Sequence, residues 1–306
     1  MTRSGDGRLT EGIDARTIWR LIEPIHAVTY FAPECRAAAK SAGLPSFWMG
    51  YFGARAAPLG PVGPSVVGAL FFNFHPGTVA RSIPDAWSFV DPSEILRMRR
   101  AAAAEALRLR IPSLESLAVT VAPVLDQVVA GANGSGRALF SANRQLDRAD
   151  DPVEALWQAC TSLREHRGDG HVAMLTASGL DGCEALVLFA AGESLDPEVL
   201  RPNRGWSPDE WASAGERLHG RGLLADRELT PAGQALRQTI EEGTDRLAGQ
   251  PYRILDRDRA RQLADDLGPA VAVLLASEVI PFPNPIGLPG PKPRAHSVTQ
   301  PNRLPD

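Results

Sequence analysis

Apolar residues recur every three or four positions over most of the chain, which predicts helices, whereas the alternating pattern of half-buried strands is rare. A capping residue followed by proline marks a series of helix starts, because the first helical position needs no amide hydrogen. One of them, Ser207-Pro208-Asp209-Glu210, has the spacing of a capping box, in which Glu210 reaches back to the Ser207 amide. We therefore predict helices that begin at Pro92, Pro152, Pro197, Pro208 and Pro231.

The order of these signals occurs twice along the chain. Residues 41–61 align without gaps on residues 177–197, with identical residues at five positions. Further on, residues 75–80 lie over residues 207–212. The same order at near-constant spacing indicates that one structural unit was duplicated.

Turn-forming and proline-rich segments suggest where the units begin and end. We expect a first unit over residues 14–130 and a second over residues 152–280. Residues 131–151 begin with turn formers and end with charge, so they are expected to be an inter-domain connection. Residues 281–306 are rich in proline and cannot be helical, so we expect an extended arm that is either disordered or laid across the body.

The second unit resembles the winged-helix domain of MarR-type regulators over residues 179–245. The resemblance rests on residues 210–237, EWASAGERLHGRGLLADRELTPAGQALR. In such regulators a recognition helix ends in a leucine and a short basic turn, GL opens a β-wing, and LT-x-x-G begins the next helix. The whole chain is also similar to a family of tandem proteins labelled SalK-like or "helix-turn-helix family", which implies no established chemistry.

Repeat and resemblance together predict a mostly α fold. Two tandem winged-helix-like units would form a single-chain pseudo-dimer through their first and last helices. The second unit would keep a minimal β-wing, and the first would have almost none. The resemblance implies a regulator that senses a ligand and binds double-stranded DNA.

The net charge of the expected recognition helix does not favour DNA binding. Residues 207–221 have a net charge of −1 with histidine neutral, because three acidic residues outnumber two arginines. DNA affinity comes largely from neutralisation of phosphates by lysine and arginine. The candidate DNA contacts are Arg217 and Arg221 in this helix and Arg227 in the wing.

An aromatic stretch in the first unit suggests a ligand pocket. Residues 47–55, FWMGYFGAR, place large aromatics and Arg55 on one side of a helix. Aromatic walls supply contact area and an arginine pairs a carboxylate, so a small aromatic or anionic molecule would fit. The alternative is that the aromatics are core and Arg55 pairs a glutamate such as Glu23. The candidate pocket residues are His26, Tyr30, Trp48, Tyr51, Arg55, Asn73 and His75.

A second polar cluster, EHRGDGH, spans residues 165–171. A metal site is one interpretation, but a spacing of five positions between two histidines does not put both on one helical face. The two glycines favour a turn that caps a helix starting at His171. We therefore expect no metal and, with no nucleotide-binding or catalytic motif, no cofactor. The cluster consists of Glu165, His166, Arg167, Asp169 and His171.

Composition restricts the remaining possibilities. The 306 residues carry a net charge of −4, so no overall positive field steers the protein to nucleic acid. Three cysteines without a CxxC pair argue against disulfides and a cysteine zinc site. We see no secretory signal and no apolar run long enough to cross a bilayer, so we expect a cytoplasmic protein that contacts no membrane.

Two functions remain open. The first is a ligand-sensing, winged-helix transcriptional regulator. The second is the same scaffold repurposed as a small-molecule-binding protein or enzyme that does not bind DNA. The acidic recognition helix favours the second, and the wing motif favours the first. Whether the chain also forms a homodimer is left open.

Overall fold

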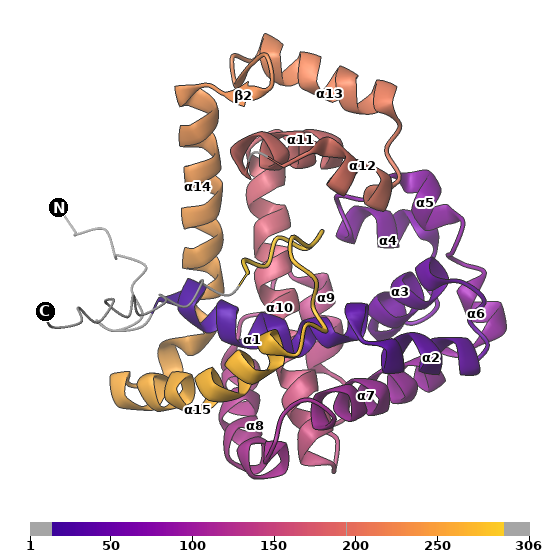
Figure 1. Ribbon diagram of the computed structural model, residues 1–306, viewed down its shortest axis with the longest axis vertical. Coiled ribbons are helices and arrows are strands. Elements are labelled where there is room, and N and C mark those ends of the chain that lie inside the picture. Colours follow the sequence, from indigo (N-terminus) through magenta and orange to yellow (C-terminus); the bar gives the residue numbers. More distant parts are fainter. Residues whose placement is uncertain (1–13, 194, 291–306) are drawn as a thin grey trace, which may run out of the picture.

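The computed structural model describes residues 14–193 and 195–290, and these form helices and one two-stranded sheet (Figure 1). The N-terminal half contains α1 (Ala15–Phe31), α2 (Pro33–Ser41), α3 (Phe47–Ala56), η1 (Ala57–Leu59), α4 (Pro64–Leu70), α5 (Pro76–Ala80), α6 (Ala86–Phe89), α7 (Pro92–Arg108) and α8 (Leu114–Gly131). The C-terminal half contains α9 (Ala138–Arg144), α10 (Pro152–Ala177), α11 (Gly182–Glu193), α12 (Pro197–Arg204), α13 (Pro208–Gly220), β1 (Leu224–Ala225), β2 (Glu228–Leu229), α14 (Pro231–Ala248), η2 (Pro251–Ile254) and α15 (Arg257–Ala276).

The proline-marked helix starts are confirmed. Helices α7, α10, α12, α13 and α14 each begin at the predicted proline, and the residue before it accepts a backbone amide with its side chain. The capping box is present too, with Ser207 and Glu210 each satisfying the other's amide. These caps satisfy amides that a helix end leaves free, which explains the sharp boundaries. The short wing is β1 paired antiparallel with β2.

Helix α10 is the centre of the molecule. It packs against α1 and α8 of the first half and against α9 and α14 of its own half (Figure 1). Trp157, on α10, is 1% exposed and lies in the largest apolar cluster, which α1, α8 and α15 complete. Because both halves pack on this one helix, a shift of α10 would change the packing in both halves.

The segment expected to connect two domains is part of the core instead. Within residues 131–151, α9 buries Leu139 and Phe140 almost completely. The Phe140 amide donates to the Asp169 carboxylate on α10 at 2.9 Å. The turn formers and charges that suggested a linker therefore flank a short buried helix.

The expected turn at residues 165–171 is also corrected, because these residues lie inside α10 without a break. Glycine disfavours a helix by only about 1 kcal/mol, which packing can outweigh. A Cβ at Gly170 would lie 2.8 Å from Arg137 Nη1, so this glycine makes room for a neighbouring arginine.

Helix α8 departs from the expectation about apolar runs. Its 18 residues are long and apolar enough to span a membrane by length and composition alone. Its buried positions, among them Leu114, Val121 and Leu125, follow helical spacing. They lie in the core cluster that includes α10, as in a core helix.

The first part of the proline-rich tail lies across the body, while residues 291–306 fall outside the described residues. Ile280 and Leu288 are buried against Ala27 and Tyr30 of α1. The side chain of Asn284 is satisfied by the backbone of Leu288. We call residues 281–290 the strap.

A bridge also joins the two halves through the loop before α5. The His75 amide donates to the Arg204 carbonyl at 2.9 Å, and the Trp206 indole donates to the Asn73 carbonyl at 2.9 Å. The His75 ring also lies 3.0 Å from Glu210 at the start of α13. The loop before α5 is thus attached to the end of α12 and the start of α13 in the other half.

We predict that Gly182→Ala destabilises the protein, because the added Cβ would lie 2.1 Å from the Phe72 carbonyl oxygen at this bridge. Backbone cannot move aside as a flexible side chain does, so we expect a loss of about 1–3 kcal/mol. The matched control is Gly215→Ala, where nothing lies within 4 Å. It should gain about 0.5–1 kcal/mol in chemical unfolding. Equal effects of the two changes would contradict the close approach.

Candidate functional site

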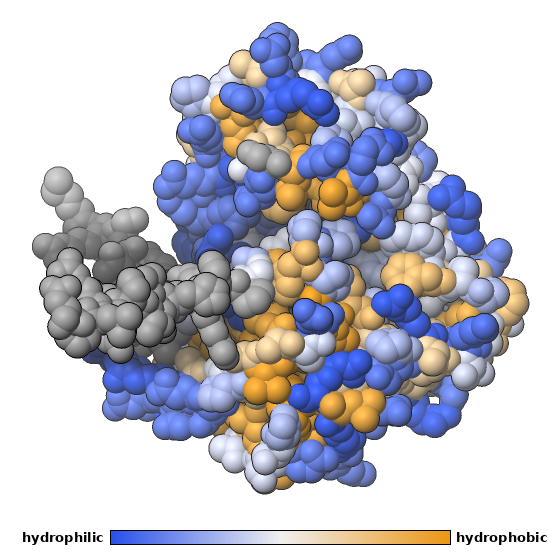
Figure 2. Space-filling view, in the orientation of Figure 1, coloured by the Kyte–Doolittle hydropathy of each residue, from blue (hydrophilic) through white to orange (hydrophobic). Residues whose placement is uncertain are grey.

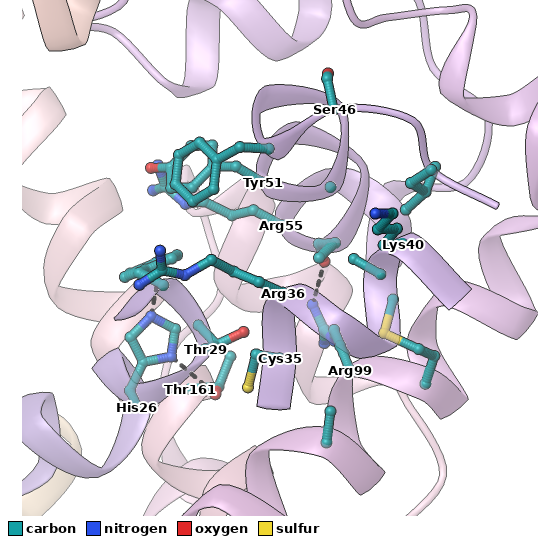
Figure 3. Close-up of a pocket in the computed structure, with 18 of the residues that line it drawn as sticks. His26, Thr29, Cys35, Arg36, Lys40, Ser46, Tyr51, Arg55, Arg99 and Thr161 are labelled. Atoms are coloured by element: carbon teal, nitrogen blue, oxygen red, sulfur yellow. Dashed lines mark hydrogen bonds between the residues drawn. The ribbon is translucent and has the colours of Figure 1, made fainter. Parts of the chain in front are cut away.

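A cavity of about 240 Å³ lies between α1, α2, α3, α7 and α10 (Figure 3). Each helix contributes polar side chains to a mainly apolar lining. The polar residues that line it include His26 and Tyr30 of α1, Arg36 and Lys40 of α2, Tyr51 and Arg55 of α3, Arg99 of α7, and Thr161 and Glu165 of α10.

An ion pair joins α3 to α10 at one side of the cavity. Arg55 donates to both carboxylate oxygens of Glu165, with distances of 2.8 and 3.0 Å, and Arg164 donates to Glu165 at 2.9 Å. The Glu165 side chain is 1% exposed. Burial alone would raise its pKa, but Arg55 and Arg164 hold the pKa well below its usual range. Glu165 is therefore ionised.

The glutamate that pairs Arg55 is Glu165 and not Glu23, the example that the sequence suggests. Glu23 accepts from the Trp19 indole at 2.9 Å and lies 3.5 Å from Arg164. Arg55 also stacks over the Phe71 ring, 4.1 Å from its centroid. Arg55 therefore pairs with a glutamate, as expected if the aromatic stretch is core. It also lies beside a cavity, as expected if the stretch forms a ligand pocket.

A hydrogen-bonded chain crosses the floor of the cavity. His26 Nδ1 lies 2.9 Å from the Thr161 hydroxyl and Nε2 lies 2.8 Å from the Tyr30 hydroxyl (Figure 3). Burial, then the nearby Arg164, lowers the pKa of His26 well below its ordinary value, so the ring is neutral. Burial raises the pKa of Tyr30, which stays a phenol. The chain offers neutral donors and acceptors but no strong base.

Arg99 has an unusual environment in the cavity wall. It is 4% exposed and, within the described part of the chain, donates only to the Ala54 carbonyl and the amide oxygens of Asn143 and Gln158. Among the described residues no carboxylate pairs with it, and its Nε atom is buried without a partner. Burial lowers its pKa to about 10, so it remains charged at neutral pH.

The cavity opens beside a positive surface on α2. Arg36 and Lys40 are exposed there, and Figure 3 shows Arg36 extending across the space between Arg55 and His26. In the interior lining, the guanidinium groups of Arg55 and Arg99 outnumber the single carboxylate of Glu165. Two positive charges and one negative charge leave one net positive charge, which favours an anionic guest.

Of the seven predicted pocket residues, the structure brings His26, Tyr30, Tyr51 and Arg55 to this cavity. Trp48 instead stacks on Phe52 within the apolar cluster of the first half. Asn73 and His75 lie at the bridge to the other half. The Trp48 and Tyr51 rings contact each other and both contact Phe74, but of these two only Tyr51 reaches the cavity.

The second polar cluster does not form one site, because successive residues of a helix point in different directions. Glu165 faces the cavity. The His166 ring packs edge-on against Phe140, and burial lowers its pKa to about 3. Arg167 pairs Asp245 of α14, and the His171 ring contacts Thr244 of the same helix. Within the described part of the chain, no three potential metal ligands come together.

Sequence reasoning missed Arg99, Arg36 and Thr161. Arg99 could have been found, because it falls on the buried stripe of α7 with Ile95, Ala102 and Ala106. A charged residue at a core position of an amphipathic helix is a signal of function or of a buried partner. Thr161 and Arg36 carry no such signal.

The candidate DNA contacts are largely engaged with protein. Arg217 donates to Asp181 and Glu184, at 2.6 and 2.8 Å. Arg221 donates to the carbonyls of Ser178 and Gly179, at the turn between α10 and α11. Arg227 is exposed at the tip of the wing.

A family model described as "Helix-turn-helix family" matches residues 15–281. Neither the curated proteins nor the solved structures contain a match.

The environment of Asp169 predicts a pH effect on stability. Burial raises its pKa to about 6, whereas an unfolded aspartate titrates near about 3.9. Between these values the folded protein binds more protons, so this group's contribution to stability falls as pH rises from about 4 to 6. Asp169→Asn should stabilise the protein by about 2 kcal/mol at pH 7 and have little effect below pH 4.

Chemical unfolding at pH 3.5, 5 and 7 measures this, with the exposed Asp265→Asn as the control that should change little at any pH. A loss of stability in Asp169→Asn at pH 7 would mean that the charged carboxylate stabilises the fold.

Proposed function

Because the chain belongs to the helix-turn-helix family, which suggests a DNA-binding protein of the regulator type, we propose that it is a ligand-sensing regulator. Its ligand is a small organic anion held in the cavity between α1, α2, α3, α7 and α10. Binding there is transmitted through α10 to the helix-turn-helix of the second half.

This proposal rests on the buried guanidinium of Arg99, which pairs with no carboxylate among the described residues. A buried guanidinium without a carboxylate is unfavourable, since its desolvation costs several kcal/mol and amide oxygens offset only part of that cost. A bound carboxylate would supply the missing charge in the place where the interior has one positive charge in excess. The lowered pKa of Arg99 expresses the same cost.

Size and lining narrow the ligand to an aromatic or similarly compact carboxylate. A dry cavity of about 150 Å³ accommodates benzene, so about 240 Å³ leaves room for a ring with a carboxylate. Phe47, Tyr51 and Trp157 line the cavity and offer ring faces, while Leu44 and Met98 add aliphatic contact. The exposed Arg36 and Lys40 would attract the anion to the opening.

We also propose that the chain is a single-chain pseudo-dimer of two winged-helix-like units. In support, the helices of the two halves follow the same order. The pair α1 and α2 corresponds to the single helix α10, and then α3, α4, α5, α7 and α8 correspond to α11, α12, α13, α14 and α15. The packing is reciprocal: α1 contacts α15 of the other half, and α10 contacts α8 of the other half. Exchange of terminal helices is the arrangement expected of a fused symmetric pair.

The link from ligand to helix-turn-helix would run along α10. Glu165 lies in the middle of this 26-residue helix, whose end leads directly into α11. The α10–α11 turn accepts both hydrogen bonds from Arg221 at the end of α13. A ligand that shifts α10 relative to α3 would therefore move the support of the recognition helix.

A second candidate, a binding protein or enzyme that does not use DNA, is favoured by the surface of α13. Its exposed residues include Asp209, Glu216 and the already paired Arg217, so the helix presents little positive charge. Phosphates would be repelled by this face.

We predict that benzoate binds more tightly than the neutral benzamide, and that Arg99→Gln weakens benzoate by about tenfold or more, because a charge-assisted hydrogen bond is lost. Isothermal titration calorimetry measures both. The control is Arg97→Gln on the same helix, an exposed arginine paired with Glu94. Unchanged benzoate affinity in a folded Arg99→Gln protein would exclude this cavity as the anion site.

We predict that any complex with random duplex DNA at low salt depends on Arg227 more than on Arg217. Arg217 must give up two carboxylates before it contacts a phosphate, whereas Arg227 is exposed. Gel-shift titrations of Arg227→Gln and Arg217→Gln at several salt concentrations measure this. A complex that depends on Arg217 instead would contradict the pairing, and no complex at any salt concentration would favour the second candidate.

A further inference from the structure

We propose that a second anion site, for a carboxylate with a long apolar chain, lies where the two halves of the protein meet. The cavity there has a volume of about 770 Å³ and is bounded by α1, α10, α11, α12, α14, the loop before α5 and the strap. It is distinct from the ligand cavity of the first half, although the two have Tyr51 and Arg55 in common.

Arg204, the last residue of α12, is the charged group of this site. It is 9% exposed and stacks over the Phe74 ring at 4.6 Å. Among the described residues, its guanidinium donates only to the carbonyls of Asn203 and Pro285, and its Nε atom is buried without a partner. Within residues 14–193 and 195–290 no carboxylate pairs with it. Burial lowers its pKa, as expected for a cation that lacks a counter-charge.

A second unsatisfied group lies in the same cavity wall. Asn73 Oδ1 is buried and accepts no hydrogen bond, while the backbone carbonyl of Asn73 accepts from Trp206. The preceding residue, Phe72, has a φ of 23°, a conformation that a bulky side chain adopts only under strain. A strained loop, an unsatisfied amide and an arginine without a counter-charge in one cavity wall indicate a binding site more than a completed core. Rotation of the Asn73 amide would exchange its oxygen for its NH2 group, which can donate to a carboxylate.

The remaining lining selects the shape of the guest. Seven arginines and three glutamates line the cavity, so its charge is positive. Apolar side chains from both halves and the strap form the rest, and Figure 2 shows apolar residues gathered in the middle of the face that the strap crosses in Figure 1. They include Phe71, Leu186, Phe189, Leu195, Phe282 and Ile286. A ligand with its carboxylate at Arg204 and its aliphatic chain along these residues would match both the positive charge and the apolar lining of the cavity.

The site exists only when the halves are together, because Asn73 comes from the first half and Arg204 from the second. The bridge holds them in place through the hydrogen bond from the His75 amide to the Arg204 carbonyl. Ligand binding here would therefore stabilise the closed arrangement of the halves. Since Arg55 belongs to both cavities, each ligand would also alter the affinity for the other.

Calorimetric titration of the full chain with decanoate and with decan-1-ol tests this proposal. We expect decanoate to bind at least about tenfold more tightly than the alcohol, because only decanoate supplies a charge to Arg204. Arg204→Gln should remove this difference. The matched control is the exposed Arg253→Gln, which should leave decanoate affinity unchanged.

Asn73→Asp provides a second test if Arg204→Gln does not fold. Its carboxylate would add a negative charge to the wall of the same cavity, so decanoate affinity should again fall about tenfold or more. In both variants benzoate should still bind, which separates this site from the ligand cavity of the first half. Absence of decanoate binding to the parent protein, or unchanged decanoate affinity in a folded variant, would overturn the proposal.

Discussion

The ionic contact of Glu165 with Arg55 and Arg164 is the constraint on which the rest of the structure depends. It attaches α3 of the first half to the helix that runs through the whole molecule, and its carboxylate is almost completely buried. Removing one partner from such a contact leaves an uncompensated charge, which typically costs about 3–5 kcal/mol. The contact is weak evidence of net stability, however, because desolvation of both partners offsets much of the attraction.

Its main consequence is geometric. The Arg55 guanidinium donates two hydrogen bonds to the Glu165 carboxylate, which fixes the separation of α3 and α10. Side chains do not fill the space beside this pair, so a cavity remains there. Arg55 therefore forms a wall of both cavities. Each cavity then has one buried arginine without a carboxylate, Arg99 in one and Arg204 in the other, so both interiors favour anions for the same physical reason.

Local signals predicted the local structure well. Prolines after capping residues located five helix starts, and the sequence of the wing located β1 and β2, because both depend on residues a few positions apart. The failures came where packing overrides local preference. Gly168 and Gly170 suggested a turn but lie within α10, and the polar residues around α9 suggested a linker but flank a buried helix. The partner of Arg55 lies 110 positions away, so no spacing rule could select Glu165 over Glu23.

We propose that the cavity of the first half is an anion site organised by Arg99 and the Glu165 contact. A crystal structure with 4-bromobenzoate tests this proposal most directly, since anomalous scattering locates the bromine independently of the protein atoms. We expect a bromine peak between α2 and α3, with the carboxylate directed toward the buried arginines. Bromine found only at the junction of the two halves, or nowhere in the protein, would contradict the proposal.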